Sequence, residues 1–113
     1  MSSLSHDDIL EQIKKTDDEI KLRIEYYETI INAILKKKES VERAKIVWST
    51  VLSFVPSEGE LPIDREDITE RFNSCNQWLS ESEIILPSIK SARDKELSDL
   101  TISRVKLVDL LDK

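Results

Sequence analysis

The chain has 113 residues, of which 35% are charged and 39% hydrophobic, and its 17 basic and 23 acidic residues give a net charge of −6 at pH 7. It contains one glycine and three prolines, whereas average usage would place about eight glycines in a chain of this length. β-Hairpins, phosphate-binding loops and strand-to-helix elbows use glycine where φ is positive, so this composition excludes them and predicts an all-α protein. The length allows one domain, and we expect residues 1–113 to form a single helical domain.

The single histidine, His6, and the single cysteine, Cys75, restrict the chemistry that the chain can perform. A zinc site needs four nitrogen or sulfur ligands and a disulfide needs two cysteines, so neither is expected within one chain. A thiol nucleophile at Cys75 would have His6, near the N-terminus, as its one available imidazole. We therefore expect no enzymatic activity, no cofactor, no metal site, and no catalytic or cofactor-binding residue.

The sequence also bears on membranes and nucleic acids. No window approaches the ~18 apolar residues of a transmembrane helix, and residues 1–8 lack the basic and apolar stretches of a signal peptide. We expect a cytoplasmic or nuclear protein with no membrane span. A basic patch that overcomes the net negative charge has one candidate, the run Lys36-Lys37-Lys38 with Arg43 and Lys45. Neighbouring glutamates dilute it, so we do not expect nucleic-acid binding.

The first long segment, residues 5–55, has no glycine or proline and begins with Ser5 as an N-cap residue. One heptad position is apolar at every repeat, as in a helix that packs along another helix. This stripe consists of Ile13, Ile20, Tyr27, Ile34, Val41, Trp48 and Val55. The companion position, three residues earlier, reads Leu10, Asp17, Ile24, Ile31, Lys38, Lys45 and Leu52. Its three charged residues weaken the prediction of a simple two-stranded coiled coil and favour partners that can receive these charges at the edge of the packed face. We predict one continuous helix over residues 5–55, with a break near residues 36–40 as the alternative.

The clear interruption of the chain contains Pro56, Gly59 and Pro62 and predicts a hairpin loop over residues 56–64. Asp64 then offers an N-cap for a helix that begins at about residue 65. The apolar stripe of this second helix consists of Ile68, Phe72, Cys75, Leu79, Ser82 and Leu86, broadened by Trp78 and Ile85.

Pro87 leaves two architectures open. If it only kinks the helix, residues 65–112 form an arm as long as residues 5–55, and the fold is a long antiparallel helical hairpin, which is our prediction. If it begins a new helix, residues 65–86 and 88–112 are separate helices and the chain is a three-helix bundle. In the last segment, Ile102 and Val105 lie on a different face of the helix from the other apolar residues. A helix that is apolar on more than one face is covered by more than one neighbour, which indicates an outside partner.

Two stretches resemble known helical families. Residues 68–86, with Trp78-Leu79 followed by spaced glutamates, resemble the first helix of a spectrin-type repeat. Glu25-Tyr26-Tyr27 and residues 81–87 are similar to runs in the family of tubulin-folding cofactor A, a small helical bundle. The resemblances imply a helical fold and, for the second family, a chaperone function, and they assign no functional residue.

Acidic residues concentrate in residues 56–86, where eight acidic residues stand against two basic ones. Helix-start charges and a solvated loop account for them, and an acidic tip that binds a basic partner surface is the alternative.

Taken together, these patterns predict a non-catalytic interaction subunit or scaffold of a hetero-oligomeric, coiled-coil-type helical assembly. A homodimer is the alternative stoichiometry, and a self-contained three-helix-bundle adaptor or chaperone is the alternative function. The expected partner interface consists of Ile13, Ile20, Ile24, Tyr27, Ile31, Ile34, Val41, Trp48, Phe72, Trp78, Ile102 and Val105.

Overall fold

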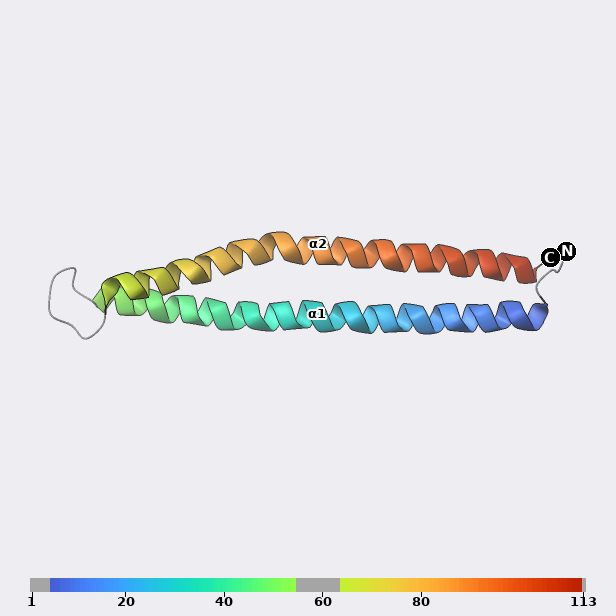
Figure 1. The fold of residues 1–113 in the computed structure, drawn as a ribbon, viewed down its shortest axis with the longest axis horizontal. Coiled ribbons are helices and arrows are strands. Elements are labelled where there is room, and N and C mark those ends of the chain that lie inside the picture. Colours follow the sequence, from blue (N-terminus) through green and yellow to red (C-terminus); the bar gives the residue numbers. More distant parts are fainter. Residues whose placement is uncertain (1–4, 55–63, 113) are drawn as a thin grey trace. The chain divides into compact units, whose positions relative to one another are not determined.

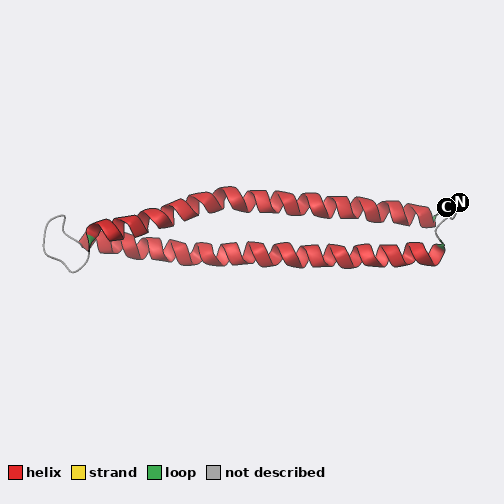
Figure 2. Cartoon of the chain, viewed as in Figure 1, coloured by secondary structure: helices red, strands yellow, loops and turns green. Residues whose placement is uncertain are grey.

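The computed structural model describes residues 5–54 and 64–112, which form two long α-helices (Figures 1 and 2). Helix α1 spans His6–Phe54 and helix α2 spans Arg65–Leu111. The fold is an all-α helical hairpin, as predicted. Val55 and the predicted loop over residues 56–64 lie outside the described residues, apart from Asp64.

Both helices begin at the predicted N-cap residues. The backbone N–H of Asp8 donates to the side-chain hydroxyl of Ser5 over 3.1 Å, and the backbone N–H of Glu66 donates to a carboxylate oxygen of Asp64 over 2.9 Å. Each cap satisfies a backbone donor that has no partner within the first turn. The two helix starts are therefore encoded locally.

Helix α1 runs without a break through residues 36–40, so the prediction of one continuous helix is confirmed over the described residues. Lysine and glutamate are good helix formers, and no turn residue accompanies them here. The hydroxyl of Ser40 donates to the carbonyl oxygen of Lys36 over 3.4 Å, and Arg43 donates to Ser40 Oγ over 3.5 Å. Both contacts join residues three or four positions apart, as in a continuous helix.

Helix α2 continues through Pro87, so the helix boundary predicted there for the three-helix alternative is absent from the described residues. A proline inside a helix removes a hydrogen bond to the carbonyl four residues before it, here Glu83, and costs ~3 kcal/mol. We attribute the continuation to packing, because residues with low exposure recur at three- and four-residue spacing on both sides of Pro87. They are Leu79, Ser82, Leu86, Ile89 and Arg93.

The chain divides into two compact units, each containing a segment of both helices. Unit 1 consists of Met1–Ile31 and Ser88–Lys113, and unit 2 of Asn32–Pro87. Within each unit, the α1 segment and the α2 segment run antiparallel (Figure 1). We call the residues of each helix that face the other helix the seam of that unit.

The seams bury little. The least exposed residues of unit 1 are Ile9, Ile13, Tyr27 and Ile31, and those of unit 2 are Ile68, at 2% exposure, and Ser82, at 5%. None of the described side chains is less than 2% exposed. Two helices shield only a narrow stripe of each other, so each unit has a packed line instead of a core.

The cap of α2 can be tested with a conservative pair of substitutions. We expect Asp64→Ala to lower the free energy of unfolding by about 1 kcal/mol, because the N–H of Glu66 loses its acceptor. Asp64→Asn keeps an acceptor oxygen at the same place and should leave stability nearly unchanged. Urea denaturation followed by circular dichroism measures both. Equal losses in the two variants would contradict a capping role.

Candidate interaction surfaces

The predicted apolar stripe of α1 faces α2 of the same chain. In unit 1, Ile13 and Tyr27 are buried and Ile20 is half-buried; in unit 2, Ile34, Val41 and Trp48 are half-buried. On α2, Phe72 and Trp78 are half-buried as well. Most of the residues expected at a partner interface thus lie at the seam of the hairpin itself.

The companion position behaves differently in the two units. In unit 1, Leu10 and Ile24 are exposed, Ile24 at 38%, whereas Ile31, at the end of the unit's α1 segment, is 7% exposed. Over the first three repeats the less exposed flank lies beyond the stripe, at Ile9, Thr16 and Arg23. In unit 2 the companion residues Lys38, Lys45 and Leu52 are half-buried. An α-helix drifts by about 20° per heptad against a strict seven-residue repeat, which is why a fixed companion position does not stay at the seam.

Charged residues at the companion position find receivers on α2. In unit 1, Asp17 accepts a hydrogen bond from the guanidinium of Arg104 in a direct ion pair. Both side chains are more than 40% exposed, so the pair contributes roughly 0.2–1 kcal/mol. For Asp17, the receiver expected on a partner thus lies on α2 of the same chain.

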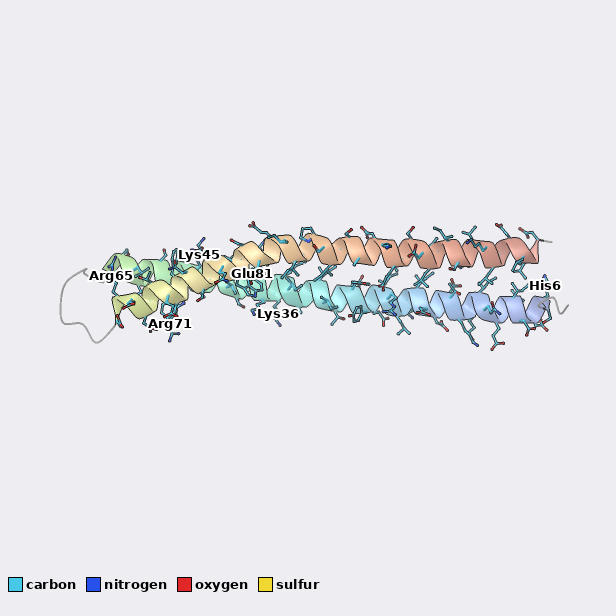
Figure 3. All side chains as sticks on the ribbon, turned by 45° about the horizontal axis from the view of Figure 1, so that its top comes forward. His6, Lys36, Lys45, Arg65, Arg71 and Glu81 are labelled. Carbon is cyan, nitrogen blue, oxygen red and sulfur yellow. The ribbon has the colours of Figure 1, made fainter. Side chains whose placement is uncertain are left out.

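Three cation–π contacts join the helices among the described residues of unit 2, and Figure 3 labels two of the cations, Lys45 and Arg71. The Lys37 ammonium lies 5.0 Å from the centroid of the Trp78 ring, and the Lys45 ammonium lies 6.0 Å from that of Phe72. From the opposite helix, the Arg71 guanidinium lies 5.4 Å from the centroid of the Trp48 ring. Such contacts at exposed sites contribute ~0.5–1 kcal/mol each. The rings at this seam are therefore covered by cations instead of by further apolar side chains.

The seam of unit 1 includes a polar contact between Tyr27 and Glu96. The Tyr27 side chain is 8% exposed and hydrogen-bonds the half-buried Glu96 carboxylate. This hydrogen bond, together with burial and the negative charge of Glu96, raises the pKa of Tyr27 above its ordinary value of 10.0. Glu96 Oε2 is buried without a hydrogen-bond partner among the described residues.

Two open grooves run along unit 2, one on each side of its seam. The Trp78 groove is lined by Ala33, Ile34, Lys37, Trp78, Glu81, Ser82 and Ile85. The Phe72 groove is lined by Lys38, Glu42, Lys45, Ile46, Ser49, Phe72, Asn76, Leu79, Ser80 and Glu83. The lining of the first groove is almost entirely apolar, whereas polar and apolar side chains share the lining of the second.

Unit 1 exposes apolar residues away from its seam. Leu22 and Tyr26 are exposed on α1. Together with Ile30 of the same helix, they line a shallow hollow. The ring of Tyr26 meets the ring of Tyr27 edge-on, with 5.2 Å between centroids. On α2, Ile102 and Val105 are both about half exposed, as their position around the helix predicts. These residues stay available for a further neighbour.

Sequence reasoning missed several residues of these surfaces. Glu96 was not singled out, because nothing in the sequence relates it to Tyr27, 69 positions earlier. Lys37 was considered only as part of a basic run and Arg71 was not singled out, although a cation within reach of a tryptophan on a paired helix is a usable signal once the pairing is known. Ser82 was recognised through its place in the apolar stripe of α2.

The described residues form neither a metal site nor a membrane span. Across residues 5–54 and 64–112, no group of three His, Cys, Asp or Glu side chains is placed to hold a metal ion. Over the same ranges, neither helix has a stretch with both the length and the hydropathy needed to cross a bilayer. No family model, no curated protein and no solved structure matches the chain. A function must therefore be inferred from the chain's own residues and their geometry.

The Tyr27 contact predicts a pH dependence. A raised pKa favours the neutral phenol in the fold, so the stabilisation is complete below about pH 10 and is lost as the pH rises through the raised pKa. We expect the melting temperature of the wild type to fall more, as the pH rises above about 10, than that of Tyr27→Phe. Tyr26→Phe, at an exposed position, should keep the wild-type profile. Parallel losses in wild type and Tyr27→Phe would contradict the contact.

The two companion residues Ile24 and Ile31 differ in burial and should differ in tolerance. Ile31→Asp places a charge at a side chain that is 7% exposed, and we expect it to lower the free energy of unfolding by roughly 3 kcal/mol or more. Ile24→Asp, at an exposed position on the same helix, should cost less than about 1 kcal/mol. Thermal melts of the two variants measure the difference. A loss at Ile24 equal to that at Ile31 would place both at the seam.

Proposed function

We propose that the chain is a non-catalytic subunit of a helical assembly, in which partner helices cover the sides of the hairpin that its own seam leaves open. The partners are other helical protein subunits, packed through apolar side chains and edge charges as in coiled coils. The chain acts as a scaffold, since its long helices offer rows of side chains instead of a pocket.

The observation that carries this proposal is the exposed area. The chain exposes 8756 Å², whereas a compact monomer of 13.1 kDa would expose about 6,400 Å². The excess of about 2,400 Å² exceeds the ~800 Å² that each partner contributes to a standard interface and is comparable with permanent interfaces. Partner binding would bring the burial of this chain to the level of a stable domain.

The kind of exposed side chain supports the same proposal. Large apolar residues with more than a third of their surface exposed occur on both helices and in both units, with Leu22 and Ile102 in unit 1 and Ile46 and Ile84 in unit 2. Charged residues separate them, so a flat hydrophobic surface of the kind that binds lipid is not formed. Interspersed apolar and charged rows are the pattern that other helices recognise.

The open grooves favour this proposal over catalysis. Acid–base chemistry needs a concave site where burial shifts the pKa of a carboxyl or imidazole group. The grooves of unit 2 are open, and the hollow beside Tyr26 is lined by α1 residues alone among the described residues. A helix laid along such a groove gains contact over its whole length, which a small substrate does not.

The proposal is tested on the isolated chain. We expect it either to associate, with a mass above 13.1 kDa, or to melt early and without a sharp transition, because a monomeric hairpin buries too little area to offset the ordering of its backbone. Analytical ultracentrifugation and a thermal melt at several concentrations measure both properties. A cooperative monomer that melts above about 55 °C would contradict partner dependence.

A further inference from the structure

The two sides of unit 2 differ in character. On the Trp78 side, the row that begins with Ala33 and Lys37 continues along α1 at three- and four-residue spacing. It contains Ser40, Ala44, Val47 and Val51, while α2 contributes Trp78 and Ile85. On the Phe72 side, the corresponding row of α1 is Lys38, Glu42, Lys45 and Ser49. Small and apolar residues on the first side permit close approach of a helix, while charges on the second favour water.

The apolar residues of the Trp78 side are exposed in the hairpin. Ile85 is 48% exposed and Val47 54%, and Ala33 is exposed as well. Trp78 is half-buried beneath the ammonium of Lys37. This side therefore presents a continuous packing surface that the described part of the chain leaves uncovered.

The charges of unit 2 point to the occupant of this side. The α1 segment, residues 32–54, has five basic and two acidic residues and a net charge of +3, whereas residues 64–87 have two basic and six acidic residues and a net charge of −4. Figure 3 shows Lys36 and Lys45 on the first segment and Glu81 on the second. Each segment attracts the other within the hairpin, and a second copy of unit 2 offers the same two segments again.

Symmetry decides how two copies meet. A two-fold axis parallel to the helices places α1 of one copy over α2 of the other, so that every neighbouring pair is antiparallel and opposite in charge. A two-fold axis across the helices places α1 over α1 and α2 over α2, which brings like charges together. Charge complementarity therefore selects the first arrangement, an antiparallel four-helix bundle with coiled-coil-like packing.

We propose that the Trp78 side of unit 2 is the interface of a homodimer, in which residues 32–54 of each copy lie over residues 64–87 of the other. This proposal rests on the proposed function and names the partner helices as those of a second copy. Lys37 and Glu81 line the same groove, so the two-fold axis brings Lys37 of each copy to the partner's Glu81.

The first experiment measures mass by sedimentation equilibrium on the full chain at micromolar concentration. The wild type should have a mass of about 26 kDa, twice that of the 13.1 kDa chain. Ile85→Glu should shift it to the monomer mass, because it places a charge in the apolar interface. Ile46→Glu is the matched control: Ile46 is 65% exposed on α1 and lines the Phe72 side, so its dimer should persist. Circular dichroism confirms that each variant remains helical.

The second experiment tests the orientation of the two copies. Lys37→Glu and Glu81→Lys should each weaken the dimer roughly tenfold, since each makes two like-charge contacts across the interface. When the two variants are mixed, both contacts become attractive, so a tagged Lys37→Glu chain should capture an untagged Glu81→Lys chain better than it captures its own kind. Glu83→Lys, on the Phe72 side, should leave the dimer unchanged.

Several results would overturn the homodimer. A wild-type monomer overturns it, as does a dimer that is unaffected by Ile85→Glu or equally sensitive to Ile46→Glu. Absence of preferential capture in the mixture overturns the proposed orientation and with it the interface. If the monomer is weakly folded, the homodimer fails and the assembly function stands, with partners of another sequence; if the monomer melts cooperatively above about 55 °C, both fail.

Discussion

A pair of helices buries one stripe of each, and the properties of this chain follow from that limit. The line of contact in each unit is a few side chains wide, and the least exposed side chain of the described residues, Ile68, remains 2% exposed. Stability must then come from what lies beside the seam as much as from the seam itself. Two features of this sequence lie beside the seam: cations that flank it, and rows of exposed apolar residues that a partner could cover.

In this hairpin, charged residues at heptad positions that are usually apolar make contacts with the opposite helix. Asp17 and Lys45 occupy positions where a two-stranded coiled coil prefers apolar residues, yet each meets a group on α2 that suits its charge. Lys37 and Lys45 place their ammonium groups over the rings of Trp78 and Phe72. The same side chains thus shield the seam and keep the molecule from offering apolar surface on every side.

Local signals in the sequence were sufficient for the helix starts at Ser5 and Asp64 and for the uninterrupted helix α1, because caps and propensities act within a few residues. The continuation of α2 through Pro87 was not decided locally, since tertiary packing had to outweigh the proline. The exposure of Ile24 depends on helical drift over several turns, and the contact of Tyr27 with Glu96 depends on the pairing of the helices. Exposure and contacts that depend on residues far apart in the sequence cannot be predicted from a single heptad.

The three ring contacts of unit 2 have a consequence for the axial register of its helices. If α2 slid by one heptad in one direction, Arg71 would replace Trp78 opposite Lys37, and Arg65 would replace Phe72 opposite Lys45, so cations would face cations. A slide in the other direction would place Ile85 and Leu79 opposite these lysines and leave both ammonium groups without a ring. Apolar stripes tolerate a shift by one repeat, whereas this alternation of rings and cations does not. The three contacts therefore specify a single axial register of the two helices in unit 2.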